Sequence, residues 1–237
     1  MSQPPDNRRT KNFILRALPA PEYNRLAPYL QPVTLAQGEV IYDTDAPIRL
    51  AYFPDRGMFS LLSTSVEGEI IEVAMVSNAG MLGTPIIWGS ETIPYRVIVQ
   101  IPGSALALRV PRLKDEFNRH GRLHDLLLHH TYALVKQISQ SAICNRFHSI
   151  RQRLCRWLLI VRDHVKTDEF LITQDYIAYM LGSRRERITE AANALQRQGL
   201  IRYKRGRIVV LDRPGLEATS CECYSIIKET YKKSADI

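Results

Sequence analysis

Hydrophobic and polar positions alternate in short stretches between Val33 and about Val110, which predicts a β-rich first half of the chain. The apolar and β-branched stretches cover residues 39–42, 50–53, 58–63, 70–76, 97–101 and 105–110. Turn signals such as Asp55-Arg56-Gly57 and Pro102-Gly103 separate them. Many short strands at this spacing are typical of an antiparallel sandwich or barrel. Residues 12–30 predict one or two short helices broken by prolines.

After Pro111 the pattern becomes helical, and residues 123–147 contain neither glycine nor proline. One apolar face of this predicted long helix contains Leu127, His130, Leu134, Ile138 and Ser141. A neighbouring face contains Leu128, Tyr132, Val135 and Ala142. A helix with two apolar faces is suited to pack on its own domain and on a partner. We interpret it as a dimerisation helix and assign the first face to the dimer interface; burial within one subunit is the alternative.

The next helix is predicted at residues 150–165. Its apolar positions Leu154, Trp157, Leu158 and Val161 are expected to face inward, and its arginines Arg151, Arg153, Arg156 and Arg162 largely outward.

Residues 171–211 predict two helices followed by a hairpin. Thr173 is placed to cap a short helix at 174–181, and Gly182 allows a tight turn. Ser183 and Glu186 have the spacing of a capping box, so a second helix is predicted at 184–198, closed by Gly199. Residues 200–204 and 207–211 are expected to pair across Arg205-Gly206. Two helices at this spacing with a basic wing indicate a helix-turn-helix that binds duplex DNA.

The polar residues of this segment divide into two predicted roles. The exposed start of the second helix offers base-reading side chains, because arginine bonds bidentately to guanine and a carboxylate accepts from cytosine. These are Arg184, Arg185, Glu186, Arg187 and Glu190. Phosphate contacts, which position the protein without specifying sequence, are expected from Thr173, Gln174, Ser183, Arg197, Lys204, Arg205 and Arg207. The alternative for Glu186 is a purely structural role as the capping-box partner of Ser183.

Charge supports the same division of the chain. The 237 residues have a net charge of +8, and residues 146–213 alone carry 15 basic and 7 acidic side chains. A basic module joined to a neutral one indicates a polyanion partner for the module and a separate task for the rest. The chain shows no apolar run of membrane-spanning length and no signal peptide, so we expect a cytoplasmic protein without membrane contacts.

Cysteine and histidine placement argues against several kinds of site. All four cysteines (Cys144, Cys155, Cys221 and Cys223) and all six histidines lie at or after residue 120. A histidine-based metal centre, a cysteine-ligated iron–sulfur cluster or a Cys–His nucleophile therefore cannot lie wholly in the first 119 residues, which argues against a cupin-like metalloenzyme. The cysteines form no CxxC pair, and His124, His129 and His130 lack the i, i+4 spacing of a helical metal site. We expect no metal site, no cofactor, no catalytic residues and no enzyme activity.

The segment with the motif IT-x5-M-LG-S-RRE-R-I-TEAANALQRQGLI-x6-IVVLD is similar to the Crp/Fnr superfamily of bacterial transcription regulators. The resemblance covers residues 33–211 and implies an α+β fold: an antiparallel β jelly roll (a double-stranded β-helix of the cyclic-nucleotide-binding type), a long dimerisation helix and a C-terminal winged helix-turn-helix. The implied domains are a sensor at 12–120, the dimer helix at 121–147, the DNA-binding domain at 148–220 and a C-terminal helix or tail at 221–237.

The resemblance also implies partners and contacts. Family members act as homodimers on palindromic operators, so a second copy and double-stranded DNA are the expected partners, with RNA polymerase as a further candidate. Arg185 and Glu186 match the Arg-Glu pair with which family members read bases. Glu190 stands where the best-known branch has a basic residue, and Arg187 where it has threonine, so its operator does not carry over.

The sensor half departs from the cyclic-nucleotide members. Gly83 is followed by Thr84 rather than glutamate, and Arg96 is shifted by one position, which points it to the other face of a strand. We therefore expect no tight binding of cyclic AMP. An unidentified small apolar effector is a hypothesis for a pocket formed by Met75, Met81, Gly83, Thr84, Trp88, Tyr95 and Arg96, with ordinary core as the alternative. Competing functions are a small-molecule-sensing interaction scaffold and a cupin-like enzyme.

Overall fold

The computed structural model describes the backbone of residues 10–235 and the side chains of residues 10–231. The chain forms two compact units, one of residues 1–61, 75–135 and 231–237, the other of residues 62–74 and 136–230. This division cuts across three of the predicted segments, the last of them at 221–237, which is divided after Thr230. The tip of a β-hairpin, residues 62–74, belongs to the second unit, and the long helix is divided after Val135.

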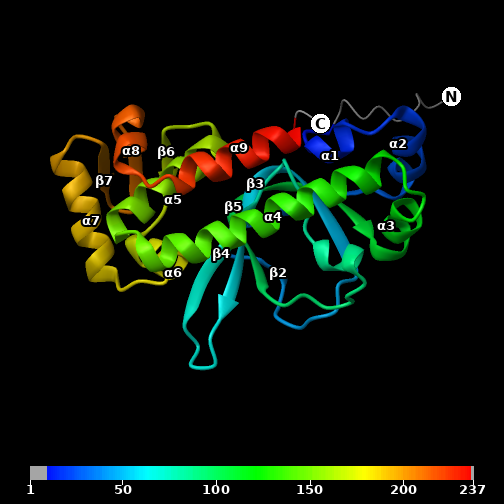
Figure 1. The fold of residues 1–237 in the computed structure, drawn as a ribbon, viewed down its shortest axis with the longest axis horizontal. Coiled ribbons are helices and arrows are strands. Elements are labelled where there is room, and N and C mark those ends of the chain that lie inside the picture. The colour runs from blue at the N-terminus through cyan, green and yellow to red at the C-terminus, as the bar shows by residue number, and fades with distance from the viewer. Residues whose placement is uncertain (1–9, 236–237) are drawn as a thin grey trace. The chain divides into compact units, whose positions relative to one another are not determined.

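Five strands form a sheet with the order β1-β5-β3-β4, in which β2 pairs with β5 (Figure 1). The sheet belongs to the first unit except for residues 62–64 of β3 and 70–74 of β4. The strands are β1 (Gln31–Leu35), β2 (Val40–Tyr42), β3 (Leu50–Thr64), β4 (Ile70–Val76) and β5 (Arg96–Arg109). β1 and β2 are antiparallel to β5, and β1 starts with Gln31 opposite Ala107. The β-rich first half is thus confirmed, with core side chains such as Phe53, Phe59 and Leu108 fully buried.

Two of the predicted turns are not turns. β3 runs through Asp55-Arg56-Gly57, and β5 runs through Pro102-Gly103. The two strands approach so closely there that a Cβ on Gly57 would lie 2.6 Å from the Ile101 carbonyl oxygen, and one on Gly103 would lie 2.1 Å from that of Arg56. Gly57 also has a φ of +91°. The glycines therefore permit a close approach of two neighbouring long strands rather than a reversal of the chain.

Short helices surround this sheet. α1 (Phe13–Arg16), α2 (Ala20–Leu26) and the 3₁₀ helix Ala27–Tyr29 precede β1, as the prolines predicted, and the 3₁₀ helix Thr84–Trp88 and α3 (Val110–Phe117) come later. The carboxylate of Glu22 accepts hydrogen bonds from the backbone N–H groups of Arg122 and Leu123, both at 2.9 Å. A distant side chain therefore satisfies the free amides at the start of α4.

The long helix α4 (Arg122–Phe147) has one buried and one exposed face. Four of the five residues assigned to the dimer interface are buried within the chain: Leu127, His130, Leu134 and Ser141; the fifth, Ile138, is half-buried. The neighbouring apolar face is the exposed one, with Leu128, Tyr132 and Val135 between 44% and 64% exposed. The assignment of the two faces is thus corrected, because Leu127, His130, Leu134 and Ser141 fill the interior of their own chain.

The second unit contains the helix-turn-helix and wing. Its helices are α5 (Ile150–Val165), α6 (Gln174–Met180), α7 (Arg185–Arg197), α8 (Arg213–Thr219) and the first part of α9 (Cys223–Ala235). α5 packs against α7 and α8 (Figure 1). The predicted wing strands are β7 (Ile201–Lys204) and β8 (Arg207–Val210). A third strand, β6 (Glu169–Leu171), pairs with β8. The sequence did not predict it, because three residues are too few to show a periodic pattern.

The interior of α5 carries two arginines that were expected to face outward. Arg153 and Arg156 are only 9% and 4% exposed, although Trp157, Leu154, Leu158 and Val161 are buried as predicted. The Trp157 indole donates to the Glu72 carboxylate at 3.1 Å, and Ile71 lies against Gly182. The residues of the β3–β4 tip therefore cover α5 and the turn of the helix-turn-helix within the second unit, which removes that side of α5 from water.

Candidate nucleic-acid interface

Local hydrogen bonds define both helices of the pair. The Thr173 hydroxyl accepts from the Tyr176 N–H at 3.2 Å and caps α6, as predicted. α6 ends in a left-handed Gly182, with φ +53°, and the Ser183 N–H donates to the Ala178 carbonyl at 3.0 Å. α7 ends in the same way at Gly199, with φ +71°. Each glycine thus closes its helix because it adopts positive φ without a steric penalty.

The predicted capping box between Ser183 and Glu186 does not form. α7 starts one residue later than expected, its N-cap is Arg184, and no side chain caps it. The Glu186 carboxylate is therefore not engaged in a cap and stays exposed in the first turn of α7. The free N–H groups at this helix start remain available to an anion such as a phosphate.

The face of α7 that was predicted to read bases is exposed. Arg184, Arg185, Glu186, Arg187 and Glu190 are all accessible, while the opposite face buries Ile188, Ala191, Ala192 and Leu195. Four of these exposed residues line a groove: Arg184, Glu186, Arg187 and Glu190. Residues 63–65 and 69–71 of the β3–β4 tip also line it. The face predicted to read bases therefore belongs to a helix whose apolar side is packed in the core.

Polar contacts hold α6 and α7 together near this face. Thr189 donates to the Gln174 side-chain oxygen at 2.7 Å, and Arg185 lies 3.5 Å from the Asp175 carboxylate. The predicted phosphate contact Gln174 thus already has a partner in its side chain, and its backbone N–H donates to the Tyr203 hydroxyl at 3.2 Å. Gln174 therefore connects α6 to α7 and to the wing through hydrogen bonds.

The wing turns at the predicted dipeptide. Arg205 and Gly206 have φ values of +51° and +76°, as a two-residue type I′ hairpin requires. The Gly206 carbonyl accepts from the Ile172 N–H at 2.8 Å, and the Tyr203 N–H donates to Gln196 at 2.9 Å. The wing is therefore tied both to the start of α6 and to the last turn of α7.

The predicted phosphate-contacting cations differ in their present contacts. Arg207 forms an ion pair with Glu169 on β6. Among the described residues, no carboxylate pairs with Arg184, Arg187, Arg197, Lys204 or Arg205, which are exposed. Five cations that lack an acidic neighbour around one helix and one hairpin form a positive surface suited to a polyanion.

Sequence reasoning missed the buried arginine beneath this site. The Arg153 guanidinium donates to the Leu181 carbonyl at the end of α6, and burial lowers its pKa from the usual value. It thereby supports the turn between α6 and α7 from α5. The only signal in the sequence is the position of Arg153 among the apolar residues of this helix. The other arginines of the same helix made it look like part of an exposed face.

The residues of the predicted effector pocket lie in the first unit and are mostly core. Met75, Met81 and Tyr95 are buried, and buried Thr84 donates to the Met81 carbonyl at 3.3 Å. Gly83 has a φ of +96°, and a Cβ there would lie 3.0 Å from the Tyr42 hydroxyl. Trp88 is 48% exposed, and Arg96 lies 3.5 Å from the Asp43 carboxylate.

Comparison with known proteins agrees with this architecture. The model of the Crp-like helix-turn-helix domain matches residues 152–219. The transcriptional regulator SdrP of Thermus thermophilus is 25% identical over 195 residues, which cover 79% of this chain and 93% of that protein. No helix in the described part of the chain has the length and apolar character needed to cross a membrane.

Solved structures share the fold. A putative transcriptional regulator of the Crp/Fnr family from Eubacterium rectale has a TM-score of 0.68 at 19% identity, covering 87% of this chain and 96% of that one. FixK2 from Bradyrhizobium japonicum has a TM-score of 0.69 at 15% identity, covering 81% and 98%. Fold and helix pair define a winged helix-turn-helix DNA-binding protein. Residues 152–219 thus match the Crp-like helix-turn-helix domain, and the chain has the fold of Crp/Fnr-type regulators and is similar to one in sequence, as the resemblance predicted.

Proposed function

We propose that this protein acts as a homodimer that binds a palindromic DNA operator through α7. The observation that carries the proposal is the exposed face of α7, where Arg184, Arg185, Glu186 and Arg187 surround the uncapped start of a helix fixed in the core. A helix start with arginine and carboxylate side chains fits the major groove and the edges of G·C pairs. The exposed positions of Thr173 before α6, Arg197 in the last turn of α7, and Lys204 and Arg205 on the wing support phosphate contacts by these residues.

The exposed stripe of α4 supports the dimer. Leu128, Tyr132, Val135, Ser139 and Ala142 repeat at intervals of four and three residues, and all are exposed. This is the a/d spacing of a two-stranded coiled coil, and at 100° per residue the stripe lies opposite the buried face of α4. A largely apolar stripe on the exposed face of a helix is suited to pair with its own copy. A two-fold dimer would present two α7 helices to half-sites about one helical turn apart.

We infer that cyclic AMP does not bind tightly to this protein. Where the cyclic-nucleotide members have a glutamate after the glycine, this chain has Thr84, which is buried with its hydroxyl on the Met81 carbonyl. A ligand that binds the folded state raises the melting temperature. We expect millimolar cyclic AMP to leave the melting temperature unchanged in differential scanning fluorimetry, and a saturable increase would contradict this part of the proposal.

The test of the function is selection of bound sequences from a random duplex pool at two salt concentrations, with purified full-length protein and no added ligand. Recovery of a palindrome with half-sites about one turn apart is the expected result. Recovery of sequence-independent, salt-sensitive binding alone would mean that the protein without effector does not read bases. Absence of any DNA binding at the lower salt concentration would overturn the proposal.

A further inference from the structure

Four side chains of types that ligate metals converge in the second unit, and one of them, His148, also borders the groove beside α7. Cys144 lies in the last turn of α4, His148 at the corner between α4 and α5, and Cys221 and Cys223 where α8 leads into α9. One ligand atom from each of them lies within 4.8 Å of all the others. Cys144 and Cys221 are 77 residues apart in the sequence, so only the fold brings this set together.

Two distances between these atoms are close to those of a tetrahedral metal site. Cys144 Sγ and Cys221 Sγ are 3.6 Å apart, and Cys223 Sγ and His148 Nδ1 are 3.4 Å apart. Zinc bonds of ~2.3 Å to sulfur and ~2.0 Å to nitrogen at tetrahedral angles place two sulfurs about 3.8 Å apart, and sulfur and nitrogen about 3.6 Å apart. We propose that Cys144, His148, Cys221 and Cys223 bind one zinc ion.

Neighbouring groups are arranged as partners of the ligands. The Glu222 carboxylate lies 3.2 Å from His148 Nε2, which leaves Nδ1 of the same ring directed at Cys223. The Gln140 side-chain amide donates to Cys223 Sγ at 3.1 Å. A carboxylate on the second nitrogen of a histidine fixes its tautomer and orientation for metal binding, and a donor to a thiolate stabilises its negative charge. Glu222 and Gln140 are thus positioning residues for the metal.

The charge around the cluster favours a metal-bound set of thiolates. Zinc with three thiolates and a neutral histidine has a net charge of −1. Arg156 on α5 is only 4% exposed, its Nε has no hydrogen-bond partner among the described residues, and it interacts electrostatically with Cys144. A buried cation is costly without a counter-charge. The proposed metal centre supplies that counter-charge, whereas three neutral thiols do not.

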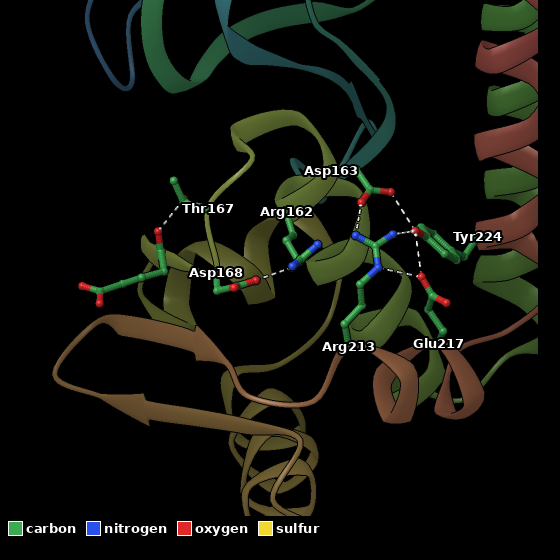
Figure 2. A network of polar contacts seen from close by, with 8 residues as sticks. Arg162, Asp163, Thr167, Asp168, Arg213, Glu217 and Tyr224 are labelled. Carbon is green, nitrogen blue, oxygen red and sulfur yellow. Dashed lines mark hydrogen bonds and ion pairs between the residues drawn. The ribbon is translucent and has the colours of Figure 1, made fainter.

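The segment that carries Cys221 and Cys223 is also held from its other side. Figure 2 shows Tyr224, the residue after Cys223, donating to Asp163 on α5 at 2.7 Å, while Arg213 on α8 donates to the Tyr224 hydroxyl at 2.8 Å. Arg213 also pairs with Asp163 and Glu217, both at 2.8 Å. This network fixes the backbone that presents the two cysteines, so the ligands are positioned before metal arrives.

The three cysteines are buried and the histidine side chain is 13% exposed, so the proposed site is closed. Four protein ligands with no open position are typical of a structural zinc site rather than a catalytic one. The zinc would fasten the start of α9 to the corner between α4 and α5, from which the helix-turn-helix follows. This inference stands apart from DNA binding and is tested without DNA.

The first experiment measures metal directly on the full-length protein. We expect about one zinc per chain by mass spectrometry of the purified protein, in line with one four-ligand site. After removal of zinc with a chelator under reducing conditions, we expect cobalt(II) to restore the visible bands of a tetrahedral thiolate complex, and zinc to displace it. Removal should lower the melting temperature, and zinc but not magnesium should restore it.

Variants assign the ligands. Cys223→Ser and His148→Ala should abolish the cobalt bands, whereas Cys155→Ser, a buried cysteine outside the cluster, should keep them. Glu222→Gln should retain the metal but weaken zinc binding by about tenfold in competition with a chelator. Because this variant keeps all four ligands, it tests the site even where a ligand variant fails to fold.

Four results would overturn the proposal. These are absence of zinc and of cobalt bands in folded wild-type protein, a Cys144–Cys221 disulfide found by mass spectrometry as the resting state, iron with inorganic sulfide in place of zinc, and metal lost equally from Cys155→Ser. The disulfide and the iron–sulfur cluster are the two other states that closely spaced cysteines adopt.

Discussion

At the scale of single residues, base reading is proposed to rest on Arg185. Its guanidinium is 62% exposed at the start of α7 and lies 3.5 Å from Asp175, a contact in water that costs little to exchange for guanine. We expect Arg185→Ala to weaken binding to the selected operator by about 1–3 kcal/mol and to leave binding to random DNA largely unchanged. Fluorescence anisotropy on both duplexes measures this, and equal losses on the two would exclude a base-reading role.

A second residue determines how stability depends on pH. His130 is fully buried on α4, with Nε2 3.0 Å from the Met81 carbonyl oxygen, and burial lowers its pKa from 6.5 to about 4. Between these two pH values the unfolded chain binds a proton that the folded chain does not. The free energy of unfolding therefore falls as pH decreases from 6.5 to 4, by up to about 3 kcal/mol from this group.

We expect urea unfolding at pH 7 and pH 5 to show this loss in the wild type and a smaller one in His130→Gln. Exposed His129 on the same helix provides the control, and His129→Gln should keep the wild-type pH dependence. His164, whose pKa burial also lowers to about 4, adds to the slope in all three proteins. An unchanged slope in His130→Gln would refute the assignment.

At the scale of elements, the wing is proposed to act on phosphates. Lys204 and Arg205 are exposed at its turn, while Arg207 is paired with Glu169. Each phosphate contact adds about 0.9 to the slope of log K against log salt. We expect the double variant Lys204→Gln with Arg205→Asn to reduce that slope by about 2, on operator and random DNA alike; asparagine is chosen because Arg205 has positive φ.

The comparison for this variant is Lys228→Gln on α9, which removes one exposed positive charge outside the wing. It should leave the salt slope unchanged. A wing variant with the wild-type slope, or a selective loss on the operator, would show that the wing does not act through phosphates.

At the scale of the whole molecule, the prediction concerns the dimer. Tyr132 and Val135 are 64% and 48% exposed on α4, and a carboxylate at either position would be desolvated in a coiled-coil seam. We expect Tyr132→Glu with Val135→Glu to be monomeric in light scattering and to lose operator affinity while retaining weak binding to random DNA. His129→Glu, on the same helix but outside the stripe, should remain dimeric, and a dimeric double variant would exclude this face.

Much of the second unit follows from the sequence because its signals are local. α5 has the predicted bounds, α6 and α7 differ from theirs by a residue at their ends, and the two glycine closures and the Arg205-Gly206 turn form where expected. Caps, positive-φ glycines and helical periodicity act over a few residues, so the surrounding fold changes them little. The predicted capping box does not form, because α7 starts at Arg185 and Ser183 therefore lies one residue before the N-cap.

Other features were decided only by tertiary structure. Periodicity shows that α4 has two apolar faces but not which of them packs against its own chain. It also predicts Arg153 and Arg156 to be exposed, because the pattern of one helix does not include the segments that pack against it. Gly57 and Gly103 indicate turns in the sequence, whereas in the structure they allow two neighbouring long strands to approach closely. Cys144, His148, Cys221 and Cys223 lack any recognisable metal spacing in the chain. Their ligand atoms meet because the helix ends that carry them are packed together, and such long-range proximity leaves no periodic trace in one sequence.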